Sequence, residues 1–122
     1  MARVLLVDDE ATVLELLKTV LELDEHEVTT ARDGNAALAA MANASFDVIV
    51  TDIVMPDREG IGLIMEIQKL KPNIPIIAMS GGGRGSVTDY LEMAALLGAR
   101  RTLSKPFSTQ ELLDAVRDVL AS

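Results

Sequence analysis

The stretch Arg3-Val4-Leu5-Leu6-Val7-Asp8-Asp9-Glu10 decides the fold of this chain. Its first five residues are typical of a buried strand, with four apolar residues after Arg3, and the run ends abruptly in two adjacent carboxylates. A second apolar run, over residues 46–51, also ends in an acid, Asp52. Ligands bind outside the carboxyl ends of the strands in an open parallel sheet, so this pattern predicts a binding site where the acids meet.

The chemistry of these acids indicates the kind of ligand. Three carboxylates brought together would repel one another unless a cation lay among them. Oxygen ligands with no His or Cys nearby suit Mg²⁺ best. Lys105 follows a further apolar run near the end of the chain and would bring a positive charge to the same edge. The sequence therefore predicts a Mg²⁺ site formed by Asp8, Asp9 and Asp52, with Lys105 holding a phosphoryl group beside it.

Length, composition and charge limit the possible classes of protein. The chain has 122 residues, of which 49% are hydrophobic, and a net charge of −8. We expect one domain over residues 1–122 with no output domain, no secretory signal and no apolar run approaching the ~20 residues of a membrane span. The absence of cysteine excludes disulfides and fits a cytoplasmic location. The negative charge argues against direct nucleic-acid binding by this domain.

Apolar runs and amphipathic stretches alternate along the whole chain. The predicted strands cover residues 3–7, 28–30, 46–51, 76–79 and 102–104, and the second of them is polar enough to lie near an edge. Helical spacing predicts helices at about residues 11–24, 33–41, 61–67, 86–97 and 108–120, with Ser108 and Glu111 forming a capping box. Five such units predict an α/β fold, a parallel sheet covered by helices on both faces.

Taken in order, the motifs resemble those of the receiver domains of two-component response regulators, over essentially the whole chain. The matching motifs are Val7-Asp8-Asp9-Glu10, Asp52-Ile53-Val54-Met55-Pro56 with Gly60, Ser80, Gly98-Ala99, and Lys105-Pro106-Phe107. The resemblance implies a flavodoxin-like, doubly wound, five-stranded parallel sheet with strand order 2-1-3-4-5. It also implies a cis peptide bond between Lys105 and Pro106.

The resemblance further implies a role for each site residue. Asp52 would be the phosphoacceptor, taking a phosphoryl group from a histidine kinase or a histidine phosphotransfer protein and then altering the binding of an unknown downstream protein. Lys105 and the Ser80 hydroxyl would contact phosphoryl oxygens. Mg²⁺ would be held by oxygen ligands, namely Asp9, Asp52 and the backbone carbonyl of Val54 directly, and Asp8 through water.

The chain departs from the family pattern at three places. Most receivers have an aromatic residue where this chain has Thr102, a switch position together with Ser80. The loop after Ser80 is longer than usual, and its surplus is Gly81, Gly82, Gly83, Arg84 and Gly85. Arg100-Arg101 replaces an acidic pair through which DNA-binding regulators dimerise. We therefore expect residues 81–86 to be mobile, and phosphorylation to reorganise residues 81–90 with little change at Thr102.

Two other classes of function remain as alternatives. The first is an interaction module that keeps the receiver fold but signals without phosphorylation; a degenerate receiver of this kind usually lacks at least one of the site residues. The second, a phosphohydrolase with an aspartyl nucleophile, is disfavoured because Val54 stands where a second acid is expected. His26, the only histidine, is interpreted as a surface turn residue, and Asp47 as a surface charge.

Overall fold

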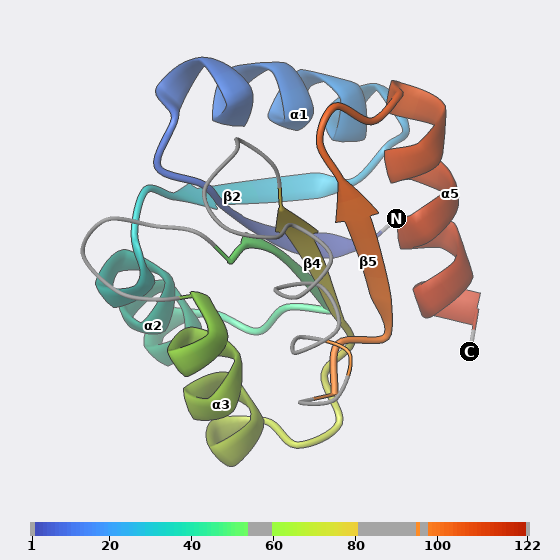
Figure 1. The fold of residues 1–122 in the computed structure, drawn as a ribbon. Coiled ribbons are helices and arrows are strands. Elements are labelled where there is room, and N and C mark those ends of the chain that lie inside the picture. Colours follow the sequence, from blue (N-terminus) through green and yellow to red (C-terminus); the bar gives the residue numbers. More distant parts are fainter. Residues whose placement is uncertain (1, 54–59, 81–94, 96–97, 122) are drawn as a thin grey trace.

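A single five-stranded sheet forms the centre of the molecule in the computed structural model, which describes residues 2–53, 60–80, 95 and 98–121 (Figure 1). All strand pairings are parallel, and the spatial order is β2-β1-β3-β4-β5, as predicted. The strands are β1 (Arg3–Val7), β2 (Glu27–Ala31), β3 (Val48–Asp52), β4 (Ile76–Ser80) and β5 (Arg101–Ser104).

Helices cover both faces of the sheet. In the described part of the chain they are α1 (Ala11–Leu23), α2 (Gly34–Asn43), α3 (Gly60–Leu70) and α5 (Thr109–Ala121). Figure 1 shows α1 and α5 on one face of the sheet, and α2 and α3 on the other. The helix predicted over residues 86–97 lies, apart from Ala95, outside the described residues. No described helix combines the length and the apolar character needed to cross a bilayer.

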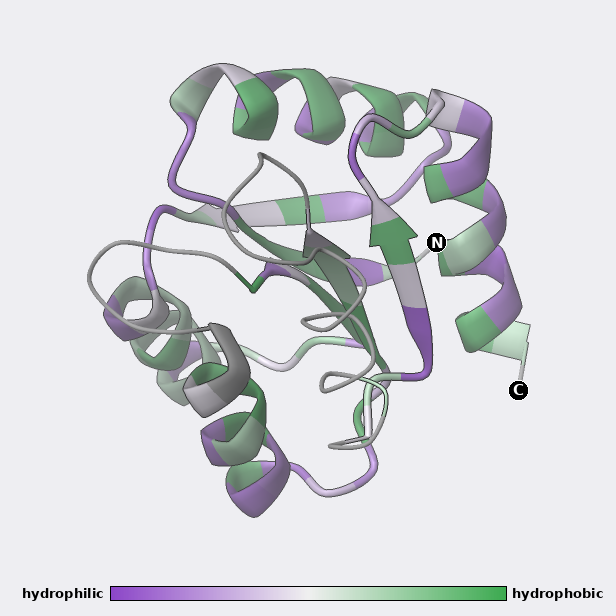
Figure 2. Ribbon diagram, viewed as in Figure 1, coloured by the Kyte–Doolittle hydropathy of each residue, from purple (hydrophilic) through white to green (hydrophobic). Residues whose placement is uncertain are grey.

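The alternation of side chains along β1 explains why all four residues after Arg3 are apolar. Val4 and Leu6 pack in the cluster beneath α1 and α5, whereas Leu5 and Val7 pack beneath α2 and α3. Successive side chains of a strand point to opposite faces, so a strand covered on both sides has no polar position. Figure 2 shows the hydrophobic colour of the central strands, beside helices that carry both hydrophobic and hydrophilic residues. The more polar β2 lies at an edge, in agreement with its sequence.

Side-chain caps define where two of the helices begin. The Ser108 hydroxyl accepts a hydrogen bond from the Glu111 amide at 3.0 Å, and the Glu111 carboxylate accepts one from the Ser108 amide at 3.1 Å. This reciprocal pair confirms the predicted capping box of α5. At α2, the Asp33 carboxylate accepts a hydrogen bond from the Ala36 amide at 2.7 Å.

Replacing Asp33 with alanine should lower the free energy of unfolding by about 1 kcal/mol, because the substitution leaves an amide at the start of α2 without its partner. Asp33→Asn is the matched control, since its side-chain oxygen can accept the same hydrogen bond. Urea unfolding of the two variants measures the difference. An equal loss in both would show that the carboxylate charge, and not the capping bond, stabilises this helix.

Candidate functional site

Polar side chains collect at the carboxyl edge of the sheet, where four strands end. Asp8 follows β1, Asp52 and Ser80 are the last residues of β3 and β4, and Lys105 follows β5. Parallel pairing brings Val7 opposite Thr51, so the residues after them, Asp8 and Asp52, are neighbours. The Lys105 amide donates to the Ser80 carbonyl at 2.7 Å. The structure thus brings together four residues that the sequence assigned to one site.

The Lys105 ammonium joins the two buried carboxylates. Its Nζ lies 2.7 Å from Asp8 Oδ2 and 3.3 Å from Asp52 Oδ2. Asp8 is fully buried and Asp52 is 5% exposed, while the lysine side chain is 20% exposed. Burial acts to lower the pKa of Lys105, but the hydrogen bond to Asp8 and the negative charge of Asp52 outweigh it, so the pKa is raised. Lys105 is therefore positively charged at neutral pH.

A group of acids suited to a metal ion adjoins this ion pair. Carboxylate oxygens of Asp8, Asp9 and Glu10 lie within 4.8 Å of one another. Among the described residues, Asp52 lies outside this group and bonds to Lys105, and Val54 is not described. Glu10 was given no role in the sequence interpretation, although it is the last residue of the first motif that carries the family resemblance. An all-oxygen donor set of this kind fits Mg²⁺.

Ser80 supplies a further indication of a ligand. Its hydroxyl oxygen is buried and has no hydrogen-bond partner among the described residues, and the whole residue is only 1% exposed. Leaving a buried hydroxyl unpaired costs about 1–3 kcal/mol, so such groups usually have a partner or a function. An oxygen of a bound phosphoryl group would satisfy it.

The structure describes some of the positions at which the chain departs from the family pattern, and others lie outside the described residues. Thr102 lies on β5, partly exposed, with its backbone opposite Ala78. Arg101 forms an ion pair with Asp118 of α5 at 2.5 Å, so its charge is used within the chain. Gly81, Gly82, Gly83, Arg84 and Gly85 lie outside the described residues, and the expected mobility of residues 81–86 and rearrangement of 81–90 stay predictions. The Lys105-Pro106 peptide bond is cis, as the resemblance implied.

The interpretation of His26 as a surface residue was wrong. Its side chain is 8% exposed, and its Nδ1 accepts a hydrogen bond from the Ala2 amide at 3.3 Å. The other ring nitrogen lies 3.4 Å from the carboxylate of Asp24. The cause is the turn between α1 and β2, where Glu25 adopts a left-handed backbone with φ of 67° and the chain folds back beside the first strand.

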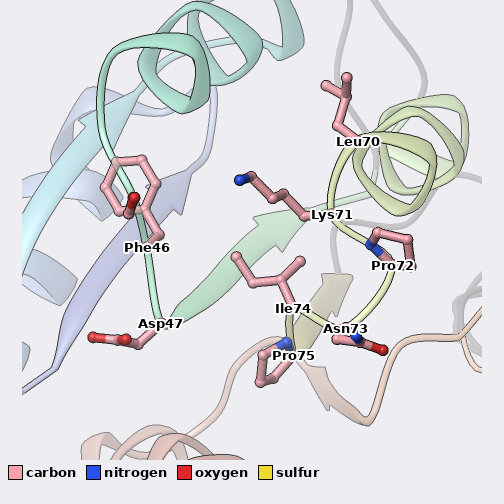
Figure 3. Close-up of a pocket in the computed structure, with 9 residues that line it drawn as sticks. Phe46, Asp47, Leu70, Lys71, Pro72, Asn73, Ile74 and Pro75 are labelled. Carbon is pink, nitrogen blue, oxygen red and sulfur yellow. The ribbon is translucent and has the colours of Figure 1, made fainter.

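Two grooves lie at opposite ends of the molecule. The first adjoins the acidic site, has a volume of about 420 Å³, and is lined by Glu10, Val13, Leu16, Leu17, Lys105, Pro106 and Phe107. The second, of about 380 Å³, lies where β3 and β4 begin, and Figure 3 shows the Lys71 side chain extending across it toward Phe46. Asp47 lines this distant groove and is exposed, so it is a surface charge as predicted.

Comparison with known proteins identifies the family. The model of the response regulator receiver domain matches residues 4–117. The transcriptional regulatory protein CpxR homolog of Haemophilus influenzae is 37% identical over 120 residues, which are 98% of this chain and 51% of that protein. The response regulator SaeR of Staphylococcus aureus is 32% identical over the same shares of the two chains. The chain thus spans about half the length of the curated relatives it matches.

Solved structures agree with this result. A response regulator receiver domain protein from Clostridium thermocellum has a TM-score of 0.91 and 33% identity, covering 99% of this chain and 95% of that one. The chemotaxis protein CheY4 of Vibrio cholerae has a TM-score of 0.86 and 30% identity, covering 98% of each chain. The sheet order, the acids and lysine at its carboxyl edge, and these matches lead to one conclusion: the chain belongs to the response regulator receiver domain family of two-component systems.

Proposed function

We propose that Asp52 is the phosphoacceptor of this receiver domain. The observation that carries the proposal is the placement of its carboxylate, 3.3 Å from the Lys105 ammonium and beside the acidic group at the end of β1. A phosphoryl group on Asp52 brings additional negative charge to this edge. The lysine and the unpaired Ser80 hydroxyl are the groups that would receive its oxygens.

The proposed reaction is a direct phosphoryl transfer. A carboxylate oxygen of Asp52 attacks the phosphorus of a phosphohistidine in a histidine kinase or a histidine phosphotransfer protein. The phosphorus–oxygen bond forms as the phosphorus–nitrogen bond breaks, and the departing imidazole nitrogen accepts a proton. Lys105 would hold an oxygen of the transferred group, because its ammonium has three donors and only two of them bond to Asp8 and Asp52.

The same edge of the sheet would hold Mg²⁺. As the family resemblance implies, Asp9, Asp52 and the Val54 carbonyl would bind the ion directly, and Asp8 would act through a water molecule. Both oxygens of Asp8 already accept hydrogen bonds, one from Lys105 and one from the Glu10 amide at 3.0 Å, which supports the indirect role. When bound, the ion supplies positive charge that offsets the charge of the phosphoryl group and the acids.

The groove beside the site is the surface that we propose the phosphodonor covers. It is shared between α1 and the segment after β5, and Lys105 belongs both to this groove and to the ion pair with Asp52. Leu16, which is 59% exposed, offers apolar area there. We propose that the state of Asp52 then passes through Ser80, with little change at Thr102, to a downstream protein or to a part of a longer chain like those of the relatives.

The test is intact-mass analysis after incubation with a small acyl phosphate and Mg²⁺. The wild-type protein should gain the mass of one phosphoryl group, and Asp52→Asn should gain none. Asp47→Asn, at the opposite end of the molecule, is the control for loss of an acid and should be modified like the wild type. Modification of Asp52→Asn would overturn the assignment, and an unmodified wild type would favour a phosphorylation-independent interaction module.

A further inference from the structure

We infer that Glu10 is an additional acidic group of the metal site and strengthens the binding of a divalent cation. This inference rests on the proposed function of the same site and extends it to a residue for which the family resemblance implies no role. The first observation is proximity: a carboxylate oxygen of Glu10 lies within 4.8 Å of those of Asp8 and Asp9.

The local structure leaves the Glu10 carboxylate available for a cation. Glu10 is the N-cap of α1, with an extended backbone (φ −90°, ψ 111°), and its side chain makes no capping hydrogen bond. A shorter side chain such as that of aspartate commonly accepts a bond from an amide of the first helical turn at this position, and Glu10 does not. Here the backbone amide of Glu10 instead donates to Asp8 Oδ1 at 3.0 Å, which holds the two residues side by side.

The charges at this edge are incompletely balanced. Lys105 bonds to Asp8 and Asp52, and among the described residues no cation pairs with Asp9 or Glu10. Independently of these acids, the buried and unpartnered Ser80 hydroxyl indicates that the same edge receives a ligand. Like charges so close together raise each other's free energy, and a divalent ion relieves this repulsion.

Glu10 also lies on the groove that we assign to the phosphodonor. On this groove its negative charge would repel a phosphoryl group in the absence of a cation. A cation held by Glu10 would replace this repulsion of the phosphoryl group with attraction. Glu10 therefore makes the approach of the donor depend on the metal.

The test is a Mn²⁺ titration of the unphosphorylated protein, followed by electron paramagnetic resonance, which detects the free ion directly. Glu10→Gln should weaken Mn²⁺ binding about fivefold, because it removes one charge close to the ion. Glu10→Asp, which keeps the charge, should retain most of the affinity. Glu15→Gln removes the same charge about 7.5 Å further along α1 and should change the affinity less than twofold.

Two results would overturn the inference: wild-type affinity in Glu10→Gln, or an equal loss in Glu15→Gln, which would show a general effect of net charge. Circular dichroism verifies that each variant is folded. Because the titration requires no phosphoryl transfer, its outcome is separate from that of the mass analysis. A protein that binds Mn²⁺ through Glu10 but is never modified at Asp52 would contradict the proposed function alone.

Discussion

Replacing Lys105 with methionine is expected to destabilise the metal-free protein by about 3 kcal/mol, the largest change in stability anticipated for this site. The lysine ammonium lies 2.7 Å from the fully buried Asp8 and 3.3 Å from Asp52. Methionine keeps much of the apolar stem but leaves both carboxylates without this cation. This loss of stability is at the lower end of the range for breaking a buried ion pair, because the lysine side chain is 20% exposed.

The dependence on pH and on metal distinguishes this electrostatic cause from a packing defect. The pKa of Lys105 is raised in the folded protein above its ordinary value of 10.5, so the stabilisation is fully present at neutral pH and is lost only as the pH rises through that raised pKa. Lys105→Arg, which keeps the charge, should be much less destabilised. Saturating Mg²⁺ should reduce the deficit of Lys105→Met, because the ion supplies the missing positive charge.

Urea unfolding at neutral pH, with and without Mg²⁺, measures both effects. Equal stability of Lys105→Met and the wild type would show that the ion pair contributes nothing. A deficit of the same size in the presence of saturating Mg²⁺ would show that lost packing, and not charge, is its cause.

The individual strands could be predicted because their determinants are local. Each central strand is a short, mainly apolar run, as a strand buried on both faces requires, and its polar residues stand only at its ends. The order of the strands came from the family resemblance, which placed acids at the ends of β1 and β3, and the structure confirms the order. The capping box of Ser108 and Glu111 was predictable for the same reason, since its partners lie three residues apart.

Distances between side chains could not be predicted in the same way. The sequence placed Asp52 with Asp8 and Asp9, but among the described residues the acidic group whose oxygens lie within 4.8 Å of one another has Glu10 as its third member. That arrangement depends on the turn after β1, in which the Glu10 amide bonds to the Asp8 carboxylate. His26 was misinterpreted for a similar reason, because its burial results from the conformation of a turn and not from any pattern of residue types.

Replacing Asp9 with alanine should weaken Mg²⁺ binding more than about tenfold and remove most of the phosphorylation of Asp52. Asp9 is partly exposed next to the buried Asp8, and no described ion pair uses its charge. The full negative charge of its carboxylate is therefore available to bind a metal ion. Asp8→Ala should weaken binding by only a few-fold, because Lys105 already offsets the charge of Asp8.

Isothermal titration with Mg²⁺ and intact-mass analysis with an acyl phosphate measure the two effects in the same preparations. Asp114→Ala, which removes an exposed acid from α5, is the control for net charge and should behave like the wild type. The test depends on the order in which the variants lose Mg²⁺ affinity. The loss in Asp9→Ala should be larger than the losses in Glu10→Gln and Asp8→Ala, since a direct ligand contributes more than a group that acts through water or at a distance. Undiminished Mg²⁺ affinity in Asp9→Ala would show that the metal does not bind at the end of β1, and the proposed site would have to be abandoned.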